Sequence, residues 1–324
     1  MLAERTASPP IAFLRFGRRA MATQFEVVLP FGTIDAEAAA TDALDLIDQL
    51  ESQLSIYRPT SEISRLNRIA GHAPVPVEPR LWELFLQARR LHAETNGAFD
   101  VTAGPLIRAW GFVDRTGRQP SAEQLAAARA AVGMDAVDFD SGRRSVQFRR
   151  PGMEVNLGSI GKGYALDRAA ERLRRRIPSG LIQGGRSSVL GWGEADWSVG
   201  LAHPWQSRRI AAVRLRDRAL GVSAATHQHF VAGERKFGHL IDPRTGEPAV
   251  GVALAAVLAP SAAEADALAT AFYILGIEGA RRYCVAHPEV SALILPEGDD
   301  AELTAVNFPP GAWRPDDAPL FDSD

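Results

Sequence analysis

Hydrophobic residues recur with two different periods along this chain. In residues 13–30, Phe25, Val27 and Leu29 occupy every second position, which predicts a β-strand. In residues 35–54, alanine, leucine and isoleucine recur at helical spacing, which predicts a long amphipathic helix. The two periods together indicate a protein that contains both strands and helices.

Capping and turn residues indicate where further helices begin and end. Ser61 can cap a short helix that follows a break at residues 57–61. Asn96 and Gly97 are expected to stop a helix over residues 81–95. Two capping boxes are expected to open further helices: residues 121–124, with a helix to 132, and residues 261–264, with a helix to about 275.

Short strands become more frequent in the second half of the chain. Residues 137–149 are expected to form a hairpin, and residues 181–257 consist mostly of short strands separated by turn-forming residues. The glycine-rich segment 158–163 leads into a helix that ends near residue 176, and a strand is expected at 291–295. Because helices and strands come in blocks and do not alternate strictly, we expect an α+β fold with mixed or antiparallel sheets.

Composition narrows the possible function classes. The chain has 324 residues, of which 46% are hydrophobic, so it can form one large domain or two intimately packed lobes. Its net charge of -3 lacks the basic excess that is typical of nucleic-acid-binding proteins, and we expect no nucleic-acid partner. The single cysteine, Cys284, cannot form an internal disulfide and is expected to be buried and inert.

The N-terminal residues lack the apolar stretch that targeting requires. The longest apolar run before Met21 is residues 11–14. A signal peptide needs an apolar region of roughly 7–15 residues and a membrane span needs ~20. We therefore expect a cytoplasmic protein without a signal peptide or a membrane segment.

The segment Gly-Ser-Ile-Gly-Lys-Gly at residues 158–163 is a candidate phosphate-binding loop. Glycines let backbone N–H groups approach a phosphate, the following helix N-terminus carries partial positive charge, and Lys162 adds a full charge. The segment is not a Walker A loop, because fewer residues separate the glycines and Gly163 follows the lysine. A tight turn with an exposed lysine explains the same pattern, and spacing alone leaves both interpretations open.

Three other side chains suit metal binding or catalysis. Asp266 and Thr270 are four residues apart and share one helix face, where a carboxylate and a hydroxyl suit Mg²⁺. His239 ends a strand before an Asp-Pro/Thr-Gly turn and could act as a general base near neutral pH. On spacing alone, a surface pair and a hydrogen-bonded structural histidine explain these residues at least as well.

Three other patterns give weaker evidence of function. His227 and His229 alternate as a metal pair would on a strand, but no third ligand follows nearby. Residues 184–188 lack the G-x-S-x-G pattern of a nucleophile elbow. No GxGxxG fingerprint follows a predicted strand, which disfavours a Rossmann dehydrogenase.

Seven segments occur in an order that is more specific than any one of them. The most distinctive are residues 239–246, His-Leu-Ile-Asp-Pro-Arg-Thr-Gly, and residues 265–270, Ala-Asp-Ala-Leu-Ala-Thr. In this order the chain resembles the ApbE family of FAD:protein FMN transferases from Met21 to about Leu295. The seven segments are residues 21–23, 57–67, 97–112, 156–165, 184–185, 239–246 and 265–270.

The resemblance implies an α+β fold related to the T-fold, with FAD bound in a cleft between two lobes. It also implies an N-terminal extension over residues 1–20, a single flavin transferase domain over 21–308 and a loose acidic tail over 309–324. Met21 and Tyr57 would flank the flavin, and the ring of Tyr57 would be available for stacking. The other residues implied to contact FAD are Ala98, Phe99, Asp100, Asn156, Lys162 and Ile241.

The resemblance further implies a metal site and a catalytic base. Mg²⁺ would be bound by the side chains of Asp266 and Thr270 and by the backbone carbonyl of Ser159, and His239 matches the catalytic histidine of the family. A Thr or Ser hydroxyl of an acceptor protein would attack the FMN phosphorus, and AMP would leave. Such a transfer depends on alignment and on neutralising negative charge. The sequence names neither the acceptor protein nor the oligomeric state.

The chain departs from the family pattern at four points. Asn156 stands where Asp is usual, Arg186 stands where Asp is common, and Ser-Ala-Ala at 223–225 replaces a Ser-Gly-Asp-like turn. The fourth is the absence of the lipoprotein signal that many relatives carry. Two other activities stay open: hydrolysis of FAD to FMN and AMP, and FAD binding by a carrier without turnover. The presence of Asp266 and His239 favours an enzyme.

Overall fold

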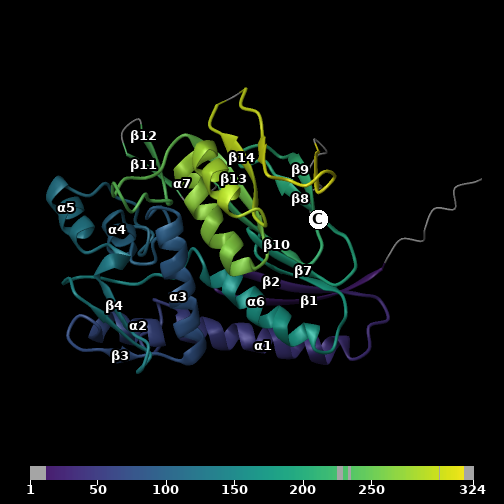
Figure 1. Cartoon of the computed structure of the whole chain (residues 1–324), viewed down its shortest axis with the longest axis horizontal. Helices are drawn as coiled ribbons and strands as arrows, with labels where there is room; N and C mark the ends of the chain where they lie inside the picture. The colour runs from purple at the N-terminus through teal and green to yellow at the C-terminus, as the bar shows by residue number, and fades with distance from the viewer. Residues whose placement is uncertain (1–11, 225–228, 233–234, 299, 317–324) are drawn as a thin grey trace, which may run out of the picture.

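An eight-stranded antiparallel sheet lies at the centre of the molecule (Figure 1). The computed structural model describes residues 12–224, 229–232, 235–298 and 300–316. The strand order is β1-β2-β6-β7-β10-β13-β14-β15, and all neighbours pair antiparallel, which confirms the expected α+β class. The strands are β1 (Phe13–Ala20), β2 (Thr23–Pro30), β6 (Gly180–Gly184), β7 (Ser188–Trp192), β10 (Arg218–Ala224), β13 (Val252–Ala259), β14 (Ser291–Pro296) and β15 (Thr304–Val306).

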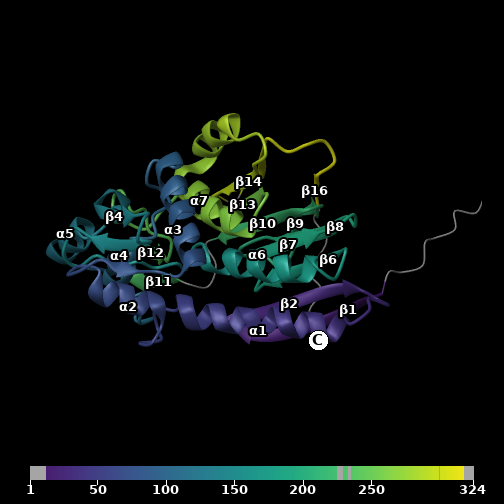
Figure 2. The same cartoon turned by 60° about the horizontal axis from the view of Figure 1, so that its bottom comes forward.

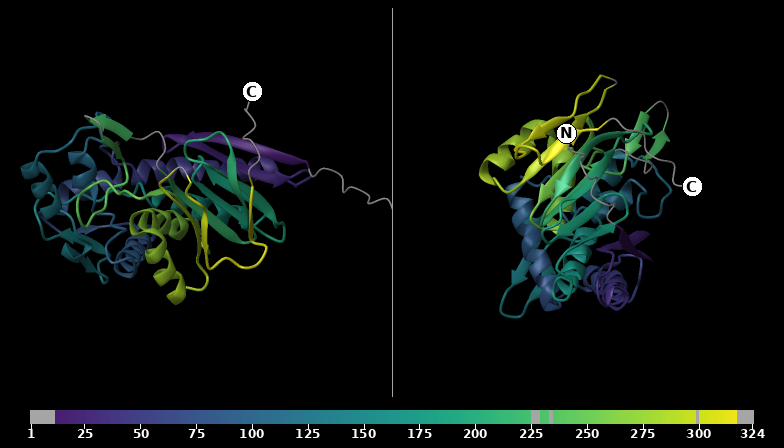
Figure 3. Two further views of the ribbon diagram at one scale, coloured as in Figure 1. Left: turned by 90° about the horizontal axis from the view of Figure 1, so that it is seen from above. Right: turned by 90° about the vertical axis from the view of Figure 1, so that its right-hand side faces the viewer.

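The central strands are buried on both faces, because each face packs against another layer. In β13, Val257 and Ala259 belong to the core beneath the helices, whereas Ala256 and Leu258 pack toward a small second sheet on the opposite face (Figure 3). This period of two follows from the alternating direction of side chains along a strand. The second sheet has the order β16-β9-β8 and consists of β8 (Trp197–Ala202), β9 (Arg209–Leu215) and β16 (Trp313–Pro315).

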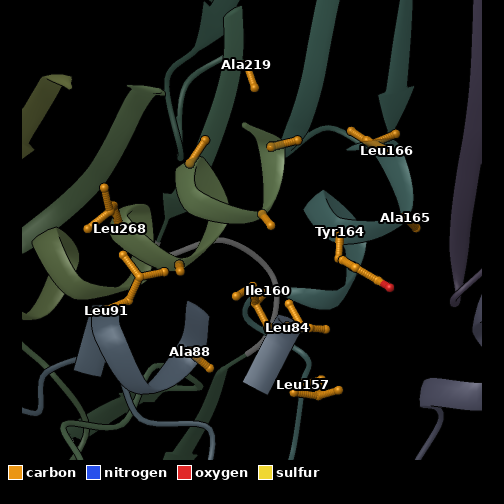
Figure 4. Close-up of a cluster of buried hydrophobic side chains, with 14 of the residues drawn as sticks. Leu84, Ala88, Leu91, Leu157, Ile160, Tyr164, Ala165, Leu166, Ala219 and Leu268 are labelled. Atoms are coloured by element: carbon orange, nitrogen blue, oxygen red, sulfur yellow. The ribbon is translucent and has the colours of Figure 1, made fainter. Parts of the chain in front are cut away.

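Three long helices cover the other face and the edge of the large sheet (Figure 2). Helix α6 (Gly161–Arg174) packs on α1 (Ala36–Leu54) and on α7 (Ala262–Ala286). Apolar side chains from α3, α6 and α7 meet beneath the sheet, as Leu91 and Leu268 do in Figure 4. The buried cluster they belong to includes residues from Ala20 to Val306 and joins the large sheet to these helices.

Shorter elements form a second lobe at one end of the molecule (left in Figure 1). Its helices are α2 (Glu62–Ile69), α3 (Pro79–Glu94), α4 (Gly104–Ala109) and α5 (Ala122–Ala130), with a 3₁₀ turn at Met134–Ala136. Its strands are β3 (Val75–Pro76), β4 (Val137–Asp140) and β5 (Ser145–Phe148), which form the predicted hairpin with β3 added, and the hairpin β11 (His229–Ala232) and β12 (Arg235–Gly238).

Residues 13–30 form strands as expected, but a turn divides them into β1 and β2. The chain reverses at Met21 and Ala22, which both have positive φ angles, and forms a hairpin in which Phe13 pairs with Pro30. Neither residue is a glycine, asparagine or aspartate, so the sequence holds no turn signal at this point. The reversal places Met21 at the end of the large sheet.

The helix ends follow the capping residues with one exception. Ser61 accepts a hydrogen bond from the Ser64 N–H, and the box at 121–124 is complete. At α7, Ser261 accepts from the Glu264 N–H, but the Glu264 side chain pairs with Arg90 on α3 and completes no box. Gly276 has non-helical backbone angles, so the first part of α7 ends near residue 275 as expected, and a second helical part continues to Ala286.

The C-terminal segment differs from the expected loose tail. Trp313–Pro315 form β16, which pairs with β9, and the Trp313 ring contacts Phe308. Burial of an aromatic ring against the second sheet explains why this part is ordered. Residues 317–324 lie outside the described residues, as do residues 1–11, which make up more than half of the stretch before Met21. None of the described helices is long and apolar enough to cross a membrane.

Helices α6 and α7 approach so closely that Gly163 has no room for a side chain. A Cβ atom on Gly163 would lie 2.0 Å from the carbonyl oxygen of Ala262. We expect Gly163→Ala to lower the free energy of unfolding by about 1–3 kcal/mol or more, because an overpacked contact forces backbone shifts. Urea denaturation measures the change. Gly71→Ala is the matched control, since nothing lies within 4 Å of its Cβ, and equal losses in both variants would contradict the close approach.

Candidate active site

Three segments that are distant in the sequence meet where central strands of the large sheet end. The Gly185 N–H donates to the Gln24 carbonyl at 2.7 Å, which joins the β6–β7 turn to the start of β2. The Val222 N–H donates to the Ser187 carbonyl at 2.7 Å, which joins the same turn to the end of β10. The antiparallel register therefore brings the turn at Met21, Arg186 and the end of β10 to one side of the molecule.

At this end of the sheet, hydrogen bonds hold the carboxylate of Asp266 in place. Its side chain is buried and accepts a hydrogen bond from the Gly163 N–H at 2.8 Å, near the N-terminus of α6. The Ser188 hydroxyl, itself fully buried, lies 2.8 and 2.9 Å from the two carboxylate oxygens. Burial raises the pKa of Asp266, and the charge of Lys162 and the two hydrogen bonds oppose that rise. The structure thus brings the candidate metal ligand next to the candidate phosphate-binding lysine.

Thr270 lies one helical turn after Asp266 on α7. Its hydroxyl contacts the backbone carbonyl of Asp266 and the hydroxyl of Ser223, each at 3.3 Å. Ser159 lies two residues before α6, close in the chain to the N–H group that binds Asp266. Carboxylate, hydroxyl and backbone carbonyl are the hard oxygen ligands that Mg²⁺ prefers, so the donor set fits this ion. Among the described residues no group of three or more His, Cys, Asp or Glu could hold a metal.

The residues 98–100 lie in the helical lobe with their side chains turned inward. Ala98 and Phe99 are each 1% exposed, which leaves only their backbone for a ligand. The Asp100 carboxylate accepts from the N–H and hydroxyl of Thr102 at 2.7 and 2.6 Å and pairs with His92 at 3.3 Å. Burial lowers the pKa of His92, but the Asp100 carboxylate outweighs it and the pKa is raised overall. These contacts of the Asp100 carboxylate therefore hold the backbone of this segment in place.

Asn156 connects this segment to the glycine-rich loop. Its N–H donates to the Val101 carbonyl at 2.7 Å, and its Oδ1 accepts from the Gly158 N–H at 2.8 Å. The side chain that replaces the family's Asp thus still holds the loop. Just before it, Glu154 accepts from Arg108 through Nε at 3.2 Å and Nη2 at 2.8 Å. Tyr57 is 66% exposed, which leaves its ring accessible.

His239 lies between the main core and a small aromatic cluster. It follows β12 and is half-buried, and the ring of Phe112 meets it edge-on with centroids 6.4 Å apart. Leu240 packs on the main core, whereas Ile241 is buried in the cluster with Trp110. The Trp110 Nε1–H donates to the carbonyl of Gly246 at 2.8 Å and anchors the Asp-Pro-Arg-Thr-Gly turn on α4.

The sequence and the fold both match known proteins. The sequence model of the ApbE family matches residues 21–294. This chain belongs to the ApbE family. It is 30% identical to the FAD:protein FMN transferase of Haemophilus influenzae over 277 residues, 80% of this chain and 79% of that protein. It is 31% identical to the FAD:protein FMN transferase of Escherichia coli K12 over 267 residues, 79% of this chain and 75% of that protein.

Solved ApbE structures share its fold. The ApbE protein of Thermotoga maritima superimposes with a TM-score of 0.84 at 27% identity, covering 91% of this chain and 97% of that protein. The flavin transferase ApbE of Vibrio cholerae gives 0.80 at 27% identity, covering 92% and 98%. The resemblance found in the sequence is therefore confirmed over nearly the whole chain.

The structure also brings residues near the candidate site that the sequence did not reveal. Ser188 reaches Asp266 from a strand 78 positions earlier, and no local pattern marks it. Arg108 and Phe112 lie in the segment 97–112, which resembles the family, but the sequence assigned no role to either residue. Asp167 follows Lys162 on α6, and its carboxylate accepts from two N–H groups at the start of α7. His227 lies outside the described residues, so the structure does not test the disfavoured metal pair of His227 and His229.

Asp167 should give this ApbE protein a measurable pH dependence of stability. Burial raises the pKa of Asp167 to about 6, although the N–H groups of Ala263 and Ala262 lower it. The native state then holds the proton more tightly than the unfolded chain, so this stabilisation is present below about pH 4 and is lost as the pH rises through about 6. The free energy of unfolding of the wild type, minus that of Asp167→Asn, should fall by up to about 3 kcal/mol between about pH 4 and 7. Urea denaturation across this range measures the difference, and a constant difference would refute the assignment.

Proposed function

We propose that this chain transfers the FMN moiety of FAD to a Thr or Ser hydroxyl of an acceptor protein and releases AMP, with Mg²⁺ required. Relatives at 30–31% identity carry the name FAD:protein FMN transferase. The observation that supports the proposal best is the buried Asp266 carboxylate, held at the N-terminus of α6 by Gly163 and Ser188 beside Lys162. We also propose that residues 21–308 form one transferase domain, since the largest buried cluster contains side chains of both the large sheet and the helical lobe.

The reaction exchanges one phosphorus–oxygen bond for another. The acceptor hydroxyl oxygen bonds to the phosphorus of the FMN half, and the bond from that phosphorus to the oxygen bridging to AMP breaks. His239 takes the proton of the hydroxyl, and AMP leaves with the electron pair of the broken bond. When bound by Asp266, Thr270 and the Ser159 carbonyl, Mg²⁺ would neutralise phosphate charge. Lys162 adds a second positive charge, and the α6 N-terminus presents N–H groups to an anion.

The flavin would be held mainly by the helical lobe. The exposed ring of Tyr57 is available to stack on it, and Met21, in the β1–β2 turn, would flank it. Asn156 and the backbone of Ala98, Phe99 and Asp100 belong to neighbouring segments that would line the flavin site. Ile241 supplies an apolar contact beside His239.

The test is incubation of the protein with FAD, Mg²⁺ and a candidate flavin-acceptor domain. Intact-mass analysis follows the acceptor, and chromatography follows the nucleotides. A mass gain of one FMN with release of AMP supports the transferase. FMN and AMP without a modified acceptor would indicate hydrolysis, and FAD that stays intact with several acceptors would indicate a flavin carrier. Omission of Mg²⁺ tests the metal requirement.

A further inference from the structure

Helices α6 and α7 hold each other's N-termini with carboxylates. Asp266 on α7 accepts from the Gly163 N–H in the first turn of α6. Asp167 on α6 accepts from the N–H groups of Ala262 and Ala263, the first two residues of α7, at 2.7 and 2.9 Å. The arrangement is reciprocal, because each helix provides both a carboxylate and the N–H donors that the other helix binds.

The geometry of the two helices explains this reciprocity. Gly163 and Ala262 are in backbone contact, since a Cβ on Gly163 would lie 2.0 Å from the Ala262 carbonyl oxygen. Asp167 and Asp266 each stand four residues after the contact point on their own helix, which places both on the facing sides. N–H groups in the first turn of a helix have no partner within the helix, and the helix dipole favours a negative charge there. Each carboxylate therefore fixes the neighbouring helix.

Asp167 acts at a distance from the proposed ligands. It lines a cavity of about 480 Å³ between α3, α6 and the start of α7. None of the residues that line this cavity is among the residues proposed here to bind FAD or Mg²⁺. The hydrogen-bonded link from Asp167 to the proposed metal ligand is the N-terminal turn of α7, which carries Asp266 one turn further on, and the charges of the two carboxylates also act on each other.

We propose that Asp167 is a positioning residue for the metal site. By binding the first two N–H groups of α7, it keeps the Asp266 carboxylate against the N-terminus of α6, where the metal is proposed to bind. The inference rests on the proposed function, because it takes Asp266 as a metal ligand. Ser261 has no such role. It caps the same helix end by accepting from the Glu264 N–H at 3.2 Å but makes no contact with α6 through that bond.

The test measures metal binding directly, with Mn²⁺ alone as the probe. The electron paramagnetic resonance signal of free Mn²⁺ gives the Kd for the full chain and its variants. We expect Asp167→Ala to raise the Kd by at least about tenfold, as the loss of a group that orients a metal ligand does elsewhere. Ser261→Ala, which weakens the same helix end, should leave the Kd unchanged within error. In the transfer assay, excess Mg²⁺ should restore the kcat of Asp167→Ala, because the ligands themselves are intact.

Each contrary result has a defined meaning. An unchanged Kd in Asp167→Ala, or an equal rise in Ser261→Ala, would overturn the positioning role. If Asp167→Ala does not fold, Asp167→Asn replaces it, and a smaller rise is expected because one acceptor oxygen is kept. A wild type that binds no Mn²⁺, or an Asp266→Ala variant that binds it as tightly as the wild type, would overturn the proposed metal site and the inference with it. Weak binding by Asp266→Ala beside normal binding by Asp167→Ala would overturn the inference alone.

Discussion

Replacement of His239 by alanine is expected to lower the rate of FMN transfer by about 10²–10⁴-fold while FAD still binds. The imidazole is the proposed acceptor of the hydroxyl proton, and a positioned general base typically contributes a factor of this size. The imidazole meets the ring of Phe112 edge-on, and the two residues that follow His239 pack in different buried clusters. The rate is measured by the mass gain of the acceptor, and FAD affinity by quenching of flavin fluorescence.

A matched histidine variant separates loss of the base from general damage. His72 is exposed at the end of α2, so His72→Ala should keep the wild-type rate. Thermal denaturation of both variants shows whether His239→Ala unfolds. A folded His239→Ala variant with unchanged transfer would remove this residue from the mechanism. A variant that loses FAD binding together with transfer would make His239 a binding residue.

Sequence periodicity predicted most of the elements because their signals are local. The helix predicted over 35–54 is α1, Ser61 and Ser121 cap helices as expected, and the strand predicted at 291–295 is β14. The hairpin at Met21 was missed because a turn with two positive φ angles formed without glycine or asparagine. The C-terminal strand β16 was missed because its pairing with β9 depends on a partner 100 residues away in the chain.

For the candidate site, too, motifs within one segment could be predicted, whereas contacts between distant segments could not. The four-residue spacing of Asp266 and Thr270 and the loop around Lys162 are visible in the sequence, and the structure brings these segments together. The partners of Asp266 come from other elements, so only tertiary packing identifies Ser188 and the N–H of Gly163. Burial also changed the interpretation of Asp100, whose carboxylate binds Thr102 and His92 in the helical lobe.

Replacement of Asp266 is the second change with a large expected effect. Asp266→Ala should reduce Mg²⁺-dependent transfer by at least about 10²-fold, because it removes the charged ligand of an ion that neutralises the transferring phosphate. Asp266→Asn keeps the shape of the side chain and an oxygen for the Gly163 N–H but lacks the charge. We therefore expect Asp266→Asn to be nearly as inactive as Asp266→Ala, since charge neutralisation and not helix packing limits the reaction. Acceptor mass gain at increasing Mg²⁺ concentration measures both variants.

The control for this prediction lies on the same helix. Glu278 on α7 is exposed and pairs only with Arg281 among the described residues, so Glu278→Ala removes a carboxylate of α7 without touching the site. Its transfer rate should equal that of the wild type. Full activity in Asp266→Asn would mean that hydrogen bonding to α6 is the whole contribution of Asp266, and the metal would then have to be placed elsewhere. Loss of activity in both the Asn and Ala variants, with folding intact and Glu278→Ala active, supports the charge of Asp266 as the main cause, because Asp266→Asn keeps the side-chain shape and an acceptor for the Gly163 N–H and gives up only the charge and one acceptor oxygen for Ser188.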